Sequence, residues 1–533
     1  MKNLSGTLLV SALASIFLLT APAIGLSQAQ APADRILING KVLTVDKNFS
    51  IVQAIAIKGE RILAVGATEE IQDLVGPNTM VADLGGRTVI PGLIDNHVHY
   101  LRGVPYWRWE VLFDAVNTRK RAMELIAEKV VSSKPGEWVL SVGGWTPGQF
   151  TDSTQRFTRE ELDRLAPNNP VFIQFGFRGG VGNSLALKAV GMENSSSGFI
   201  GSVGRFAGFP EVVRKALPRI TEESYKNEYL KKNNEDYNRA GITALWEAGA
   251  IHYPNRFTEW VQEYVEENGG WSNLRIFHHF KSDARTPEQA DRIMKAVRDS
   301  PPLEKGDYFR IQGFGEIPYI PTYDVLEPWG PNEEQFGVYR KILETIVEKR
   351  WQVSEHVMQT KKFDPLLDIW EEIDKKYDIK PLRWTFHHCY GMEKKHLERA
   401  AKLNMFAAMQ ISPAMTRGGV ARYFSSNSPP FRTAQESGIK WGLGTDAKIV
   451  SPYPAFFTIN PEQTVSRKDA LIAHTRSNAW YLFMEDDLGS IEPGKYADIV
   501  VLDRDYMTCP DKEIRDIESI LTIVGGRVGY EAK

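Results

Sequence analysis

The chain has 533 residues, of which 42% are hydrophobic and 25% charged, and its net charge at pH 7 is −3. The composition is typical of a globular protein, and the slight negative charge argues against a nucleic-acid-binding function. A chain this long exceeds one simple core, so we expect a large catalytic domain with a smaller accessory domain.

The N-terminus carries the pattern of a secretory signal peptide. Lys2 precedes an apolar run at 8–24, and the small-residue motif "SQA" follows at 27–29. We therefore expect residues 1–29 to be removed on export and the mature protein to be periplasmic or secreted. An uncleaved membrane anchor is the alternative. No later segment is apolar enough to cross a bilayer, so we expect no stable membrane insertion.

Residues 30–90 and 486–533 have the pattern of short strands and turns. The stretches "RILINGKVLTVD" and "VQAIAIKGERILAVG" alternate apolar and polar residues and break at Asn39-Gly40 and Gly59-Glu60. This pattern predicts a meander of hairpins. The C-terminal stretches "ADIVVLD" and "ESILTIVGGRVGY" are similar, so we expect the two ends of the chain to form one small β-sandwich.

Residues 91–485 alternate strand-like runs with helical stretches. Helical spacing is present in "RAMELIAEKVVSS", "YRKILETIVEKR" and "HLERAAKLN". The strand candidates are "EWVLSVGG", "PVFIQFG", "ITALWEAG", "LRIFHHF", "YFRIQGFGE", "WQVSEHV", "LRWTFHH", "MFAAMQIS" and "IKWGLGTD". This alternation predicts an α/β fold, a (β/α)8 TIM-like barrel with its chemistry at the C-terminal strand ends.

Residues 102–190 are rich in aromatic residues and glycine, which we interpret as a lid subdomain inserted into the barrel. Four rings in or beside it are candidates for lining an apolar pocket: Trp107, Trp109, Trp145 and Phe150. They predict a bulky, partly aromatic substrate. Ordinary packing within the insert is the alternative.

Residues that commonly bind metals stand at the ends of four strand candidates. "PGLIDNHVHY" carries His97 and His99, two residues apart and hence on one side of a strand. His356 ends "WQVSEHV", His388 ends "LRWTFHH" and Asp446 ends "WGLGTD". Because these ends meet at one face of a barrel, they predict a site for a divalent ion such as Zn²⁺.

Several stretches resemble a known family. "VIPGLIDNHVHY", "GLGTDA" and "LGSIEPGKYADIVVLD", in this order, resemble the amidohydrolase superfamily. "GITALWEAG", "GNSLAL" and "SRKDALIAHTRSNAWYL" are similar to its amidohydrolase family 3 branch, which includes N-substituted formamide deformylase-like enzymes. The resemblance covers nearly the whole mature chain. It implies that His97, His99, His356 and His388 ligate metal, and that Asp446 is both a ligand and the catalytic proton acceptor.

The resemblance implies an exported zinc-dependent hydrolase of a small molecule, cleaving an amide or cyclic amide C–N bond other than a peptide bond. A divalent ion lowers the pKa of a bound water, and a carboxylate can pass that water's proton to the leaving nitrogen. The alternatives are a metal-assisted lyase or isomerase acting on a carbonyl compound, and a non-catalytic ligand-binding or regulatory protein. A homodimer is a further expectation.

The chain departs from the family pattern at several positions. Many members carry a lysine on the fourth strand whose carbamate bridges two metals, whereas "YFRIQGFGEIPYI" has Glu316 there. We expect one zinc ion. Two zinc ions bridged by Glu316 are the first alternative, and a gating role for Glu316 is the second. His387 replaces a common acid and Arg178 a common histidine, and we interpret both as substrate-binding residues.

The chain has two cysteines, Cys389 and Cys509. We expect Cys389, next to His388, to be a buried free thiol. A single disulfide is the alternative.

Overall fold

The structure is a computed structural model. It describes residues 31–533 except 114–115, 117, 143–144, 146, 176–178, 202–209, 250–255, 302, 304–305, 325–329, 411–428 and 447–460. The predicted signal peptide at 1–29 and Arg178 therefore lie outside the described residues. Every helix within the described ranges is too short or too polar to span a bilayer.

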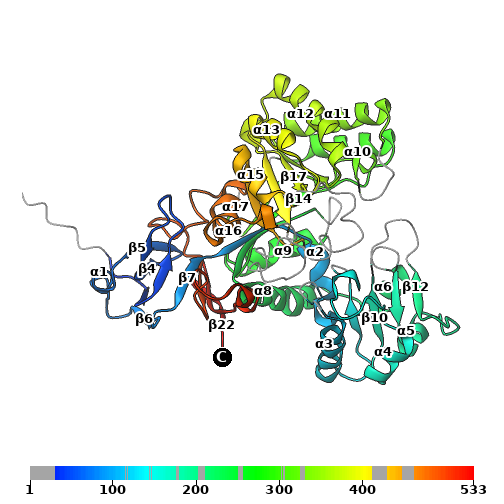
Figure 1. Cartoon of the computed structure of the whole chain (residues 1–533), viewed down its shortest axis with the longest axis horizontal. Helices are drawn as coiled ribbons and strands as arrows, with labels where there is room; N and C mark the ends of the chain where they lie inside the picture. The colour runs from blue at the N-terminus through cyan, green and yellow to red at the C-terminus, as the bar shows by residue number, and fades with distance from the viewer. Residues whose placement is uncertain are drawn as a thin grey trace, which may run out of the picture.

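An eight-stranded sheet at the centre of the molecule curls into a barrel (Figure 1). Its strands follow one another in chain order, and each pair of hydrogen-bonded neighbours is parallel. They are β8 (Leu93–Val98), β13 (Ile242–Glu247), β14 (Arg275–Phe280), β15 (Phe309–Phe314), β16 (Gln352–Val357), β17 (Thr385–His388), β18 (Phe406–Gln410) and β19 (Lys440–Gly444). The predicted TIM-like barrel is confirmed.

Helices cover the outside of the barrel. They are α8 (Lys231–Arg239), α9 (Arg256–Glu267), α10 (Pro287–Asp299), α11 (Glu333–Glu348), α12 (Phe363–Tyr377), α13 (Lys394–Lys402), α15 (Phe431–Ser437), α16 (Arg467–His474) and α17 (Arg476–Tyr481). Helix α11 shows why they form, since Asn332 and Gln335 make a capping box at its start. Its buried residues follow helical spacing and include Tyr339, Ile342, Leu343 and Ile346.

The barrel closes where its first strand, β8, meets the end of its last strand, β19. The backbone N–H of Asp446 donates to the carbonyl of His97 at 2.8 Å. The Thr445 hydroxyl donates to the carboxylate of Asp95 at 2.6 Å. Burial raises the pKa of Asp95 to about 6, although hydrogen bonds from Thr445 and His97 oppose the rise. These contacts join the two strands that carry His97 and Asp446.

Helix α17 strengthens the same junction. The side-chain amide of Asn478 donates to the carbonyl of Ile94 in β8 at 2.6 Å and to that of Leu443 in β19 at 2.8 Å. The two strands approach so closely that a Cβ on Gly444 would lie 2.3 Å from the side-chain Oδ1 of Asn96 and 2.9 Å from the backbone N of His97. Glycine is therefore required at this position.

A second domain is inserted after β8 and lies to one side of the barrel (Figure 1). Its four-stranded sheet has the order β12-β11-β10-β9. Its elements are α3 (Arg119–Ser132), β9 (Val139–Ser141), α4 (Arg159–Leu165), β10 (Val171–Gln174), β11 (Gly179–Gly182), α5 (Ser184–Ala189), β12 (Phe199–Gly201) and α6 (Glu211–Ala216). The strand candidates "EWVLSVGG" and "PVFIQFG" thus belong to the insert. The insert continues past the predicted end at residue 190, because β12 pairs with β11.

The two chain ends form a β-sandwich on the opposite side of the barrel (Figure 1). One sheet has the order β5-β4-β1-β6 and the other β22-β21-β20-β7-β2-β3. The strands are β1 (Arg35–Ile38), β2 (Lys41–Leu43), β3 (Ile51–Val52), β4 (Ala54–Lys58), β5 (Arg61–Gly66), β6 (Met80–Asp83), β7 (Thr88–Pro91), β20 (Ile499–Leu502), β21 (Ser519–Val524) and β22 (Arg527–Glu531). One hydrophobic cluster joins both sheets and both chain ends, and includes Leu37, Ile55, Val89, Ile499 and Ile523.

The predicted meander needs one correction. Gly59-Glu60 does connect an antiparallel hairpin, β4–β5. Asn39-Gly40 instead leads the chain from one sheet to the other, because β1 pairs with β4 and β6 whereas β2 pairs with β3 and β7. Asn39 has φ 58°, a left-handed conformation that asparagine tolerates and that redirects the chain at this corner.

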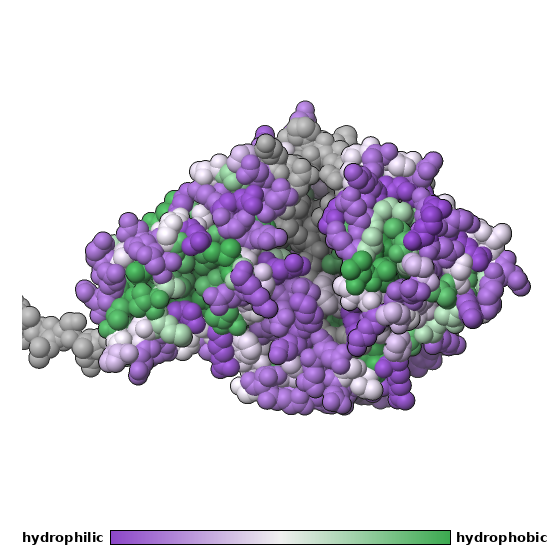
Figure 2. All heavy atoms as spheres, turned by 90° about the horizontal axis from the view of Figure 1, so that it is seen from below, coloured by the Kyte–Doolittle hydropathy of each residue, from purple (hydrophilic) through white to green (hydrophobic). Residues whose placement is uncertain are grey.

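The outer surface of the sandwich carries an apolar area, seen on the left in Figure 2. The exposed large hydrophobic residues among the described residues of this domain are Ile51, Val75, Met80, Val81 and Val528.

A buried ion pair joins the sandwich to the barrel. Nε and Nη2 of Arg275, at the start of β14, each donate to the carboxylate of Asp498 at 3.0 Å. The rings of Tyr308 and Tyr496 each lie with their centroid 4.1 Å from the guanidinium carbon. The pair is almost fully enclosed, so its geometry couples the two domains.

Replacing Arg275 by methionine should therefore lower the free energy of unfolding by about 3–5 kcal/mol, because Asp498 would keep a buried charge without its partner. Chemical denaturation of the two proteins measures the difference. The control is Lys58→Met, which removes an exposed ion pair with Asp34 and should cost at most about 1 kcal/mol. Equal stability of the two variants would contradict the importance of the buried pair.

Candidate metal centre

Four imidazoles and two carboxylates converge at the C-terminal end of the barrel. They belong to His97 and His99 of the β8 end, Glu316 after β15, His356 of β16, His388 of β17 and Asp446 after β19. The side chains of His99 and Asp446 are 15% and 18% exposed, and the other four are buried. The cluster thus has one side open and the rest enclosed.

Glu316 lies at the centre of the cluster. Its Oε2 is 3.0 Å from Nδ1 of His356 and 3.4 Å from Nε2 of His388. The same oxygen is 3.7 Å from Nε2 of His97. Its Oε1 is 3.7 Å from Nε2 of His99. The two oxygens of this carboxylate therefore face different histidines.

Asp446 faces the cluster from the other side. Its Oδ1 lies 3.5 Å from Nε2 of both His97 and His99. Its Oδ2 lies 3.8 Å from Nδ1 of His388. The structure therefore brings together all five ligands implied by the sequence and adds Glu316 to them.

The charges in the cluster suit a cation-binding site. Burial opposes ionisation of Glu316, but the neighbouring His97 and His356 hold its pKa well below the usual value. The pKa of Asp446 is lowered in the same way, since His97 and His388 outweigh the effect of burial. Burial lowers the pKa of His388 to about 4. At neutral pH the carboxylates are ionised and His388 is a neutral imidazole with a free lone pair.

The unsatisfied atoms of the cluster fit a divalent metal ion. Nε2 of His97 and Nδ1 of His388 are buried and have no hydrogen-bond partner among the described residues. Two groups of donor atoms lie within 4.8 Å of one another, His97 with Glu316 and His388, and His97 with His99 and Asp446. Imidazole nitrogens and carboxylate oxygens are the donors that zinc accepts.

The backbone at the cluster adopts an uncommon conformation. His388, Cys389 and Asp446 have φ of 70°, 55° and 49°, the left-handed region that residues other than glycine seldom enter. Such residues concentrate at functional sites, where the surrounding structure holds them. Cys389 is buried and both cysteines are free, so the predicted free thiol is confirmed.

His387 does not line a substrate pocket, and that prediction is wrong. The side chain is fully buried, and its Nδ1 lies 2.7 Å from Nδ1 of His97. Its Nε2 lies 3.2 Å from the hydroxyl of Tyr481, and its ring stacks on Trp246 with centroids 4.3 Å apart. His387 thus sits on the side of His97 opposite the carboxylates.

This contact gives Nδ1 of His97 a polar partner. Only one of two facing Nδ1 atoms can carry the proton of the hydrogen bond. Burial, together with the neighbouring His97, keeps the pKa of His387 well below its usual value, so His387 is neutral. Such a ring can accept Nδ1–H of His97 at its own Nδ1 while its Nε2–H is directed to Tyr481. Nε2 of His97 faces Glu316 and Asp446, and although burial opposes it, these carboxylates raise the pKa of His97.

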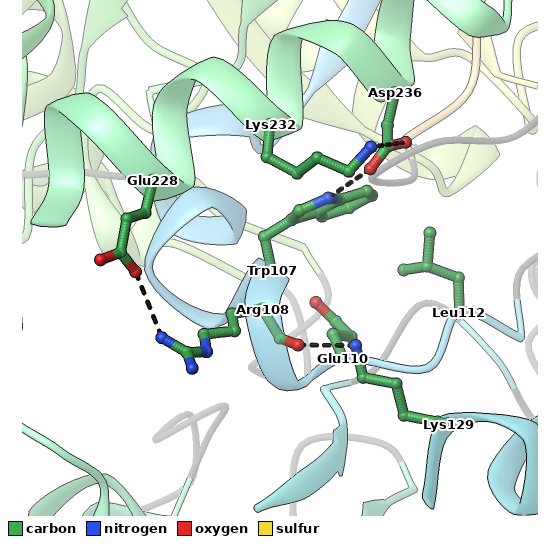
Figure 3. A pocket seen from close by; sticks show the side chains of 8 residues that line it. All are labelled: Trp107, Arg108, Glu110, Leu112, Lys129, Glu228, Lys232 and Asp236. Atoms are coloured by element: carbon green, nitrogen blue, oxygen red, sulfur yellow. Dashed lines mark hydrogen bonds and ion pairs between the residues drawn. The ribbon is translucent and has the colours of Figure 1, made fainter. Parts of the chain in front are cut away.

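Trp107 lines a cavity outside the cluster. The cavity has a volume of about 350 Å³ and lies between α3, α8 and the short helix Val104–Trp109 (Figure 3). The indole N–H of Trp107 donates to Asp236 at 2.7 Å, and Arg108 pairs with Glu228 at 3.2 Å. None of the residues that line this cavity belongs to the histidine–carboxylate cluster.

The other three predicted pocket rings are packed in the insert, which corrects their assignment to a substrate pocket. Trp145 and Phe150 stack with centroids 5.6 Å apart in the hydrophobic cluster on one face of β10. Trp109 is buried in the cluster on the other face, where Phe172 lies. A small four-stranded sheet needs large rings to fill both of its faces, and these residues meet that need.

Three polar residues near the site were not identified from the sequence. Asp95 stands within the stretch "DNHVHY", but its role at the barrel junction depends on closure of the sheet. Tyr481, in α17, and Asp324, in the loop after β15, lie far from the histidines in sequence, and no local pattern marks them.

A TIM-like barrel with imidazoles and carboxylates gathered at its C-terminal strand ends defines a metal-dependent hydrolase. Residues 80–530 match the model of the amidohydrolase family, and the chain belongs to that family. The protein is therefore a metal-dependent hydrolase acting on carbon–nitrogen bonds other than peptide bonds.

Several known proteins are similar to this chain over almost their whole length. The N-substituted formamide deformylase of Arthrobacter pascens is 24% identical over 93% of this chain and 98% of its own. Protein LONG AFTER FAR-RED 3 of Arabidopsis thaliana is 24% identical over 93% of this chain and 92% of its own. An uncharacterized metal-dependent hydrolase from Pyrococcus furiosus has a TM-score of 0.61 at 21% identity, over 89% of this chain and 100% of that one. The zinc complex of atrazine chlorohydrolase TrzN from Arthrobacter aurescens TC1 has a TM-score of 0.53 at 16% identity. The match covers 93% of this chain and 95% of that one.

Replacing His387 by leucine should weaken metal binding about 10–100-fold, because Nδ1–H of His97 would lose its acceptor and the ring its orientation. Metal content after dialysis against graded chelator concentrations measures the effect. Tyr481→Phe, which removes only the hydroxyl beyond His387, is the control and should cause a smaller loss. Undiminished metal retention in His387→Leu would show that His97 does not depend on this contact.

Proposed function

We propose that the protein is an exported zinc-dependent amidohydrolase that cleaves an amide or cyclic amide bond of a bulky, partly aromatic small molecule. The main support is the position of Asp446 beside Nε2 of His97 and His99 at the open side of the cluster. A carboxylate there can reach both bound water and an entering substrate.

Zinc is favoured by the donor set of four imidazoles and two carboxylates. A relative with the same fold, atrazine chlorohydrolase TrzN, is described in complex with zinc. The name of the Arthrobacter pascens relative points to N-substituted formamides as substrates of that enzyme, which supports an amide substrate here. When bound, the ion supplies Lewis acidity and lowers the pKa of water.

The two carboxylates have different tasks in this proposal. The side chain of Asp446 is 18% exposed, whereas that of Glu316 is 5% exposed and surrounded by imidazoles. Asp446 therefore accepts the proton of the attacking water and donates it to the leaving nitrogen, while Glu316 holds charge within the centre. His97, His99, His356 and His388 direct ring nitrogens at the same space.

Asp446→Asn should reduce the turnover number at least about 100-fold, because the amide cannot accept the proton. Metal content of the purified variant should stay close to wild type, since the histidines and Glu316 remain. Steady-state kinetics on a panel of aryl amides, lactams and N-acyl amines measures the turnover number. Elemental analysis measures the metal content.

The same panel tests the proposed reaction and substrate class. Incorporation of ¹⁸O from labelled water into the acid product identifies hydrolysis, and its absence would indicate a lyase or isomerase. Faster turnover of small acyclic amides than of aryl amides would contradict the bulky aromatic substrate. Metal-loaded protein that binds these compounds and converts none of them would indicate a non-catalytic ligand-binding protein.

We further propose that Glu316 bridges two ions, because its Oε1 faces His99 while its Oε2 faces His356 and His388. Protein purified without chelator should then contain close to two zinc ions per chain, and Glu316→Ala at most one. Glu355→Gln replaces a buried acidic side chain that bonds Tyr339 instead, so this control should leave the stoichiometry unchanged. One ion per chain in the wild type would contradict the bridge.

Export is supported by the leader pattern of residues 1–29. N-terminal sequencing of the protein recovered from the periplasm or medium should begin at Gln30. Association into a homodimer stays a prediction, which analytical ultracentrifugation of the mature protein tests.

A further inference from the structure

His356 has a polar neighbour on the side of its ring that faces away from the centre. Its Nδ1 lies 3.0 Å from Glu316, and its Nε2 lies 3.3 Å from Oδ1 of Asp324. Nε2 and Oδ1 are both buried, and neither has a hydrogen bond of full geometry among the described residues. The contact therefore brings together two buried polar atoms that are otherwise unsatisfied.

Asp324 is anchored to the backbone that follows His356. Its Oδ2 accepts the backbone N–H groups of Met358 at 2.8 Å and Gln359 at 3.0 Å. The side-chain amide of Gln359 donates to the carbonyl of Asp324 at 3.0 Å. These three bonds fix the carboxylate to the end of β16, so it keeps its position relative to the imidazole.

The carboxylate of Asp324 is held by backbone donors. Its side chain is fully enclosed, and Nζ of the equally enclosed Lys362 lies 3.6 Å from Oδ2. Burial lowers the pKa of Lys362 to about 6, so the two backbone N–H groups are the donors that favour the ionised, accepting form of Asp324. Oδ1, the oxygen that bonds neither backbone group, is the one directed at His356.

We propose that Asp324 is a positioning residue that holds the proton of His356 on Nε2 and thereby presents Nδ1 as a lone-pair donor to the metal centre. A neutral imidazole has one N–H, and an ionised carboxylate can only accept. With Nε2–H directed at Asp324, Nδ1 is free to bind a cation beside Glu316. The contact also fixes the ring plane and makes the imidazole more basic, which strengthens its bond to a metal.

This inference rests on the proposed function in one respect, the divalent ion, and it goes beyond it by assigning a role to a residue outside the ligand cluster. It also distinguishes the two halves of the centre. His97 directs its outer nitrogen at a neutral acceptor, His387, whereas His356 directs its outer nitrogen at an anionic one.

Asp324→Asn tests the proton position directly. The carbonyl oxygen of the asparagine would keep the two backbone N–H groups, which leaves its NH₂ group facing Nε2 of His356. That group donates, so Nε2 must become the acceptor and the proton must move to Nδ1. We expect the zinc affinity of the mature protein, measured by competition with a chromophoric chelator, to fall 10–100-fold. Asp324→Ala removes the acceptor and adds no donor, so the proton of His356 can reside on either ring nitrogen. This variant should lose less zinc affinity than Asp324→Asn.

A double-mutant cycle with His356 separates positioning from general damage to the fold. In a His356→Ala background, Asp324→Asn should cause no further loss of zinc affinity, because the residue it acts through is gone. Glu355→Gln is the matched control for replacement of a buried acidic side chain in the same strand region. It bonds Tyr339 and Thr322 and not the imidazole of His356, so zinc affinity should stay within about twofold of wild type. Thermal unfolding of each metal-free variant checks that it is folded.

The inference would be overturned if Asp324→Asn kept a zinc affinity within twofold of wild type. It would also be overturned if Asp324→Asn lowered zinc affinity as much in the His356→Ala background as in the wild type. Failure of the wild type to take up zinc would overturn it as well. Because zinc binding is measured without substrate, a protein that shows the expected pattern but hydrolyses no amide would contradict the proposed function and leave this inference standing.

Discussion

The contact between β8 and β19 is the constraint on which the site depends. His97 and Asp446 are 349 positions apart in the chain, yet the backbone N–H of Asp446 bonds the carbonyl of His97. Asp95 and Asn478 tie the same two strands together from either side. Without this closure the first and last strands would lie at opposite edges of an open sheet, and the ligands would form two incomplete sets. The fold therefore assembles the centre by closing a ring of parallel strands.

The ligands depend in turn on polar groups buried around them. His97 directs its outer nitrogen at His387 and His356 directs its outer nitrogen at Asp324. In both cases the partner lies against the ring nitrogen that faces away from Glu316. Low solvent access makes these contacts strong, because a buried polar atom has no water to replace a lost partner. The geometry of the centre is thus set by residues that do not belong to it.

The two outer domains have separate cores and different relations to the barrel. The sandwich is held to the bottom of the barrel by the Arg275–Asp498 pair between two tyrosine rings. The insert follows directly on the strand that carries His97 and His99, and most of its aromatic residues fill the two faces of its own sheet. Trp107 is the exception among the four predicted rings, since it faces a cavity between the insert and helix α8. Aromatic content in an insert therefore says little about a pocket until the sheet that it packs against is known.

Local pattern in the sequence determined the class of fold, the residues at the strand ends and the family. Strand ends in "DNHVHY", "WQVSEHV" and "GLGTD" follow from periodicity, because neighbouring residues along a chain are sufficient to define a strand and its last side chains. Tertiary structure decided the rest. The inward position of His387, the corner at Asn39-Gly40, the assignment of two strands to the insert and the role of Asp324 all depend on contacts between distant segments. Periodicity carries no information on which distant atom a side chain will meet, so only the folded barrel could supply these partners.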